Sequence, residues 1–83
     1  MIVVYRNAAY DLSKATYFGL HDDTELVVSF GDDPIRVVAY NDKKFAWDAW
    51  IALLTALQRR ITLYELPQEV LNDTDQQATG QND

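Results

Sequence analysis

The chain has 83 residues, no cysteine and a formal net charge of −6. A chain of this length forms one small domain and buries only about 60% of the surface that its unfolded form exposes. Without cysteine it can form neither a disulfide framework nor a thiolate metal site, and no apolar run approaches the roughly 18 residues of a membrane span. We therefore expect a cytoplasmic protein with no membrane association.

The negative charge is concentrated at the end of the chain. Residues 1–60 hold eight acidic and seven basic residues, whereas residues 61–83 hold five acidic residues and no Lys or Arg. A nearly neutral body lacks the basic surface that phosphate binding requires, and it also lacks the dense acidic surface of a DNA mimic. Composition therefore disfavours nucleic acid as a partner.

Short β-prone segments separated by turn signals fill the first half of the chain. Strands are predicted over residues 2–5, 15–20, 25–30 and 35–40, with turns at 6–7, 21–24 and 31–34. Residues 8–14 are expected to be irregular, with room for a short strand piece. Successive strands joined by tight turns predict an antiparallel meander of three or four strands.

The stretch from residue 41 to 61 is predicted to be one long helix. Asn41 suits the N-cap, and Arg59 and Arg60 lie where positive charge stabilises the last free carbonyls. At about 100° per residue, the large apolar side chains span an arc of about 160°, which is wider than one sheet face needs. That arc contains Leu53, Ala46, Leu57, Trp50, Ile61, Leu54, Trp47 and Ile51, whereas Asp48, Ala52, Thr55, Ala56 and Arg59 lie opposite.

Residues 61–66, with the sequence ITLYEL, suit an extra edge strand or an extended arm. The last twelve residues have a single Ala as their only apolar residue and are expected to be disordered. The sequence thus predicts an α+β domain over residues 1–71, a meander packed on one long C-terminal helix, followed by a disordered acidic tail over residues 72–83.

Strand alternation predicts which side chains face the helix. If Glu25, Ser29 and Arg36 point away from it, an outer face forms that holds Tyr17, Val27, Val38 and Tyr40. The inner face is then expected to hold Leu26, Val28, Phe30, Ile35, Val37 and Ala39, with Phe18 and Leu20 joining them.

No pattern of chemistry-bearing residues predicts catalysis. His21, Asp22 and Asp23 are metal-ligand types, but consecutive turn residues point in different directions and no second histidine exists. No glycine-rich phosphate loop or nucleophile elbow is present in the sequence. We therefore expect no catalytic residue, no metal site, no cofactor and no enzymatic activity.

The expected function is protein–protein interaction, with a second copy of the chain as the first candidate partner. The candidate surfaces are the outer face with Tyr17, Val27, Val38 and Tyr40, and the helix shoulder with Trp47 and Ile51. The ITLYEL segment could instead cover that shoulder. Small acidic proteins of this kind include many bacterial and phage accessory proteins.

Two alternatives belong to other classes. Tyr17 and Tyr40 beside Arg36 could stack single-stranded nucleic acid on an open sheet face. A small-molecule or metal-dependent catalyst would need a deep pocket that holds a carboxylate with a raised pKa.

Overall fold

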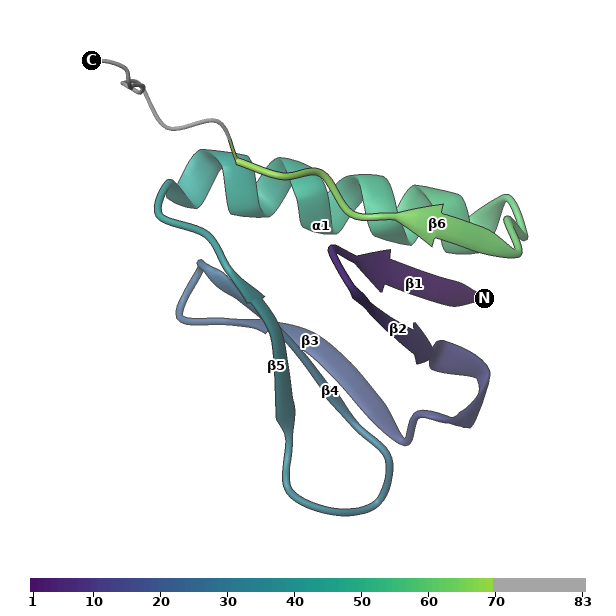
Figure 1. Cartoon of the computed structure of the whole chain (residues 1–83). Helices are drawn as coiled ribbons and strands as arrows, with labels where there is room; N and C mark the ends of the chain where they lie inside the picture. Colours follow the sequence, from purple (N-terminus) through teal and green to yellow (C-terminus); the bar gives the residue numbers. More distant parts are fainter. Residues whose placement is uncertain (70–83) are drawn as a thin grey trace.

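The computed structural model describes residues 1–69. The predicted disordered tail over residues 72–83 lies outside this range. The elements are β1 (Ile2–Tyr5), β2 (Ala8–Asp11), the 3₁₀ helix η1 (Leu12–Lys14), β3 (Tyr17–His21), β4 (Glu25–Ser29), β5 (Ile35–Ala39), helix α1 (Lys43–Gln58) and β6 (Leu63–Glu65) (Figure 1). The chain is α+β, with an antiparallel meander followed by one helix, so the predicted fold class is confirmed.

The first strand does not join the meander but forms a separate sheet of order β2-β1-β6. β1 pairs antiparallel with β2 and parallel with β6, and the crossover between β1 and β6 includes α1. The pairing continues past the strand ends, because Ile2 N–H donates to the Thr62 carbonyl at 2.8 Å and Leu66 N–H donates to the Val4 carbonyl at 2.9 Å. The predicted extra edge strand after the helix is therefore present, on β1.

The second sheet is the meander β3-β4-β5. Its first turn is built by Asp22 and Asp23, whose φ angles of 53° and 62° both lie in the left-handed region. Two consecutive left-handed residues form the type I′ turn that matches the twist of a hairpin, and aspartate tolerates this conformation better than most residues. This turn lies near the start of α1, whereas the loop between β4 and β5 extends away from the helix (Figure 1).

A β-bulge in β5 overturns part of the predicted register. Leu26 pairs with Val38, but Val27 pairs with Arg36, so Val37 is an extra residue on β5. One inserted residue moves all later side chains to the opposite face. Val38 and Tyr40 are therefore buried in the core, with 7% and 4% exposure. The prediction that they point outward is wrong.

The far end of the inner sheet face is open to solvent. Phe30 and Ile35 are 38% and 46% exposed, although Ile35 pairs with the fully buried Val28. Both flank the β4–β5 loop, which the helix does not reach (Figure 1). The prediction that they are covered by the helix is therefore wrong.

Helix α1 starts one residue later than predicted, because Asp42 rather than Asn41 is the N-cap. The Asp42 carboxylate accepts a hydrogen bond of 3.3 Å from the Lys44 backbone N–H. Three of the four buried helix residues are small, namely Ala46, Ala49 and Ala56, and the fourth is Leu53. Ala56 was expected on the solvent side and is only 6% exposed. The buried stripe is therefore rotated away from the large apolar residues Trp47, Ile51 and Leu54, which are exposed.

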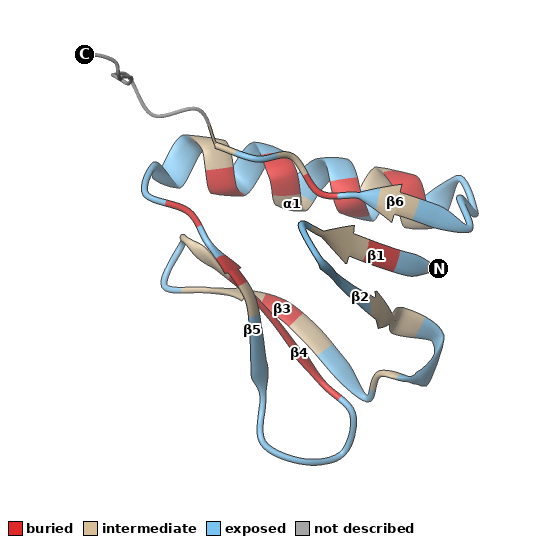
Figure 2. Cartoon of the chain, viewed as in Figure 1, coloured by how far each residue is buried: buried red, intermediate tan, exposed pale blue. Residues whose placement is uncertain are grey.

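A single core joins the two sheets, the helix and the segment after β6 (Figure 2). Its buried members are Val3, Leu26, Val38, Tyr40, Ala46, Ala49, Leu53 and Leu66. Because Leu66 belongs to this core, the residues directly after β6 are held against the domain.

Candidate interaction surface

Three large apolar side chains form an exposed stripe along α1. Trp47, Ile51 and Leu54 are 44%, 55% and 40% exposed. Their spacing of four and three residues places them on one face of the helix. We call these three residues the helix stripe. Exposed apolar residues scattered singly are ordinary, but a contiguous row along one helix face is typical of an interaction site.

Along one edge, the helix stripe adjoins the β3–β4 hairpin, which contacts the helix at two tryptophans. The Trp47 indole Nε1–H donates a hydrogen bond of 3.2 Å to the Asp23 carboxylate in the β3–β4 turn. One turn further along, Trp50 packs edge-on against Phe18 of β3, with ring centroids 5.7 Å apart. Trp47 is therefore held in place by its polar edge while much of its ring stays exposed.

The segment after β6 runs back along a different side of the helix (Figure 1). The Tyr40 hydroxyl donates to the Pro67 carbonyl oxygen at 2.7 Å, and the Glu69 carboxylate accepts from the backbone N–H groups of Asn41 and Asp42 at 2.8 Å each. Pro67 lines an open groove of about 250 Å³ together with Phe45, Asp48, Ala49 and Ala52.

The ITLYEL segment and residues 67–69 therefore do not cover the shoulder formed by Trp47 and Ile51. Sequence reasoning left open whether this arm or another molecule occupies the shoulder. Among residues 1–69, no segment does.

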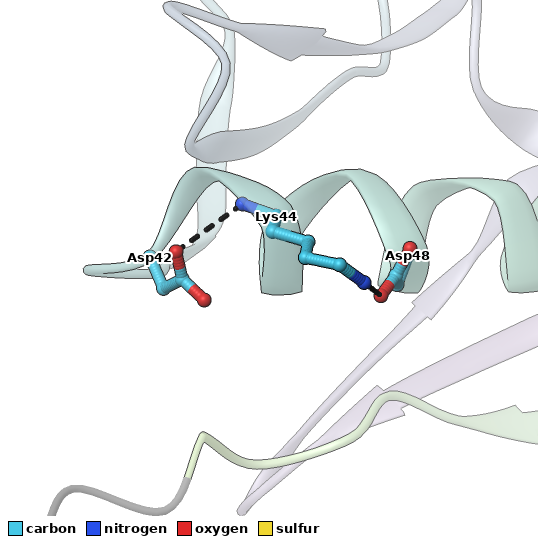
Figure 3. A network of polar contacts seen from close by, with 3 residues as sticks. All are labelled: Asp42, Lys44 and Asp48. Atoms are coloured by element: carbon cyan, nitrogen blue, oxygen red, sulfur yellow. Dashed lines mark hydrogen bonds and ion pairs between the residues drawn. The ribbon is translucent and has the colours of Figure 1, made fainter.

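A local ion pair lies next to the helix stripe. The Lys44 ammonium donates to the Asp48 carboxylate at 3.0 Å, one helical turn away, while the Lys44 backbone N–H is bound by Asp42 (Figure 3). The hydrogen bond to Asp48 raises the pKa of Lys44 above its ordinary value. Both side chains are well exposed, so the pair adds little to stability, but each charge already has an opposite neighbour.

The structure does not assemble the predicted outer sheet surface. Tyr17 is 47% exposed, whereas Val27 is 7% exposed and Val38 and Tyr40 belong to the core. Tyr17 lies over Gly19 on the outer face and shares a hydrogen bond of 2.6 Å with His21 Nε2. Only Tyr17 of the four residues therefore remains available to a partner.

The predicted surface for stacking single-stranded nucleic acid needs Tyr17, Tyr40 and Arg36 on one open sheet face. Tyr40 is buried, and Arg36 lies 3.8 Å from the Glu25 carboxylate. Tyr17, Tyr40 and Arg36 therefore do not share one open face.

A catalytic site would need a deep pocket that holds a carboxylate. The cavity between the sheets and the helix has a volume of about 20 Å³ and an apolar lining that includes Phe18, Leu26, Val28 and Trp50. This space holds no more than a water molecule. Within residues 1–69, no group of three or more His, Asp or Glu side chains is placed to hold a metal ion, and His21 is engaged by Tyr17.

Two residues of this surface were not singled out from the sequence. Leu54 lies next to Trp47 in the predicted apolar arc, and that angular position was the signal that it would share the exposure of Trp47. Asp23 gave no signal, because its contact with Trp47 depends on how the hairpin folds against the helix.

Comparison with known proteins adds no relative: no protein-family model, no curated protein and no solved structure matches this chain. In the described part of the chain, no helix has the length and apolar character needed to cross a membrane.

Proposed function

We propose that this protein is a non-enzymatic accessory protein of the cytoplasm that acts by binding another protein through the helix stripe. The observation that carries the proposal is the exposure of Trp47, Ile51 and Leu54 together with the position of the chain's own arm on another side of the helix. Interface centres are enriched in aromatic residues such as tryptophan, and most charged residues are depleted there.

The chemistry of the stripe favours a protein surface over a small ligand. The row is convex, because it lies along a helix, whereas small molecules bind in concave pockets. A protein partner can cover such a row with a complementary helix or groove. The hydrogen bond to Asp23 holds Trp47 before binding, which lowers the entropic cost of ordering it in a complex.

Site-specific photo-crosslinking in cells tests the proposal. A photoreactive amino acid at position 51 is expected to give discrete protein adducts, with either a second copy or a different protein. The matched control is position 35, where isoleucine is exposed to a similar extent, 46% against 55%, at the far end of the meander. Equal labelling from both positions, or no adduct from position 51, contradicts the proposed function.

A further inference from the structure

The two ends of the helix stripe carry opposite charge. Around the start of α1 lie five carboxylates against two ammonium groups, and Asp23 touches Trp47 directly. The carboxylates belong to Asp22, Asp23, Asp42, Asp48 and Glu69, and the ammonium groups to Lys43 and Lys44. At the other end, Arg59 and Arg60 follow the last helical turn, both exposed. The row of apolar side chains therefore runs from an acidic end to a basic end.

We infer that the helix stripe binds the helix stripe of a second copy of this chain, with the two helices antiparallel. The inference rests on the proposed function and names its partner. A helix of 16 residues is about 24 Å long, so its two ends act as separate charged sites. A parallel pair would place acid against acid and base against base. An antiparallel pair related by a two-fold axis places each Asp22–Asp23 turn against Arg59 and Arg60 of the other protomer.

The apolar contacts fit the same arrangement. With the two-fold axis between Ile51 and Leu54, Ile51 of each helix meets Leu54 of the other, and Trp47 lies opposite the region of Gln58 on the other helix. The hydrogen bond from Trp47 holds Asp23 beside the helix stripe. In the antiparallel pair Asp23 then lies near Arg59 and Arg60 of the other protomer. Lys44 is already paired with Asp48 and competes little for the Asp22–Asp23 turn (Figure 3).

The contact area is small, which sets the expected strength. Three partly exposed side chains and two exposed charge clusters bury less area than the roughly 800 Å² per partner of a standard interface. We therefore expect a dissociation constant of about micromolar order or weaker. Because the charged contacts are exposed, the dimer is expected to weaken as salt rises.

Sedimentation equilibrium of the full chain at several salt concentrations tests the existence of the dimer. Ile51→Asp is expected to weaken association at least about tenfold, because it places a carboxylate at the centre of the contact. The matched control Ile35→Asp adds the same charge to a similarly exposed isoleucine and is expected to leave association unchanged. A wild-type chain that stays monomeric at several hundred micromolar overturns the inference, and so does equal weakening by both substitutions.

A charge exchange tests the antiparallel orientation. Arg59→Glu/Arg60→Glu and Asp22→Lys/Asp23→Lys are each expected to weaken self-association, because like charges then meet at both ends of the dimer. An equimolar mixture of the two variants is expected to regain dimerisation, since both contacts again join opposite charges. If each variant dimerises as well as the wild type, or if the mixture stays monomeric, the antiparallel arrangement is wrong.

Lysine is less suited than aspartate to the left-handed turn at positions 22 and 23, so circular dichroism accompanies these measurements. If that variant is unfolded, Asp22→Asn/Asp23→Asn takes its place, because asparagine tolerates the same backbone. This variant is expected to weaken the dimer several-fold and to reduce its salt dependence, and an unchanged constant overturns the inference. If the chain is monomeric but position 51 forms adducts with a different protein, the proposed function stands and this inference is overturned.

Discussion

The hydroxyl of Tyr40, just before α1, donates a hydrogen bond of 2.7 Å to the carbonyl oxygen of Pro67, just after β6. Tyr40 is 4% exposed and contacts Phe45 of the helix at 5.1 Å between ring centroids. The hydrogen bond between Tyr40 and Pro67 therefore joins the residues that precede the helix to the segment that runs back along the helix after β6.

We predict that the free energy of unfolding falls above pH 10 because of Tyr40. Its pKa is raised above the ordinary value of 10.0, mainly because burial penalises the charged phenolate. Below that pH the phenol is protonated in both states, and above it the unfolded chain loses the proton first, so stability falls by at most about 1.4 kcal/mol per pH unit.

Urea unfolding between pH 8 and 11 measures this effect. Tyr40→Phe is expected to cost about 1 kcal/mol at pH 8, where the hydrogen bond to Pro67 is lost, and to flatten the alkaline decline. Tyr17→Phe is the control, because Tyr17 is exposed, and it should keep the decline. An identical alkaline slope for Tyr40→Phe and the wild type would count against this role of Tyr40.

We predict that Glu69 stabilises the start of the helix. Its two carboxylate oxygens accept from the backbone N–H groups of Asn41 and Asp42. Glu69→Ala leaves both groups to water and is expected to lower the free energy of unfolding by about 1 kcal/mol. Hydrogen exchange at Asn41 and Asp42 should accelerate at the same time. Gln68→Ala, at the exposed neighbouring position, is expected to change neither quantity, and equal effects of the two substitutions would refute the assignment.

We predict that Arg60→Gly stabilises the monomer. Arg60 has a φ of 59° directly after the helix, and the Ile61 and Arg60 N–H groups donate to the carbonyl oxygens of Ala56 and Leu57 at 3.0 Å each. This is the Schellman pattern, in which glycine is the favoured residue at the left-handed position. The expected gain is about 1 kcal/mol in thermal or urea unfolding of the monomer. Arg60→Ala, which loses the charge but keeps a Cβ, should bring no such gain.

We predict that Gly19→Ala displaces Tyr17. An added Cβ would lie 2.5 Å from the Tyr17 hydroxyl oxygen, so the flexible tyrosine ring must move and its bond with His21 must break. The loss of stability is expected to stay below about 1 kcal/mol, because Tyr17 is exposed. The His21 ring resonances in NMR spectra should shift as they do in Tyr17→Phe. Unchanged resonances in Gly19→Ala would contradict the contact.

The sequence by itself was sufficient for the fold class, for the strands of the meander and for the helix, whereas β2 and the 3₁₀ helix η1 lie in residues 8–14, which were expected to be irregular with room for a short strand piece. Turn residues such as Asp22, Asp23 and Gly31 separate the strands of the meander, and the periodic stretch over residues 41–61 predicts the helix, which ends three residues earlier, at Gln58. These signals are local, because they depend on the backbone preferences of a few adjacent residues. The apolar width of the helix also indicated that Trp47 and Ile51 exceed what one sheet can cover.

Only the tertiary structure decided which faces are buried. The bulge at Val37 reversed Val38 and Tyr40, and no glycine or proline marks it in β5. The helix buries Ala46, Ala49, Leu53 and Ala56 against the rest of the domain and leaves Trp47, Ile51 and Leu54 exposed. Both outcomes depend on contacts between segments distant in the sequence. The periodicity of a sequence shows which face of a helix or strand is more apolar. Which face is buried depends on the segments that pack against that element in the folded chain.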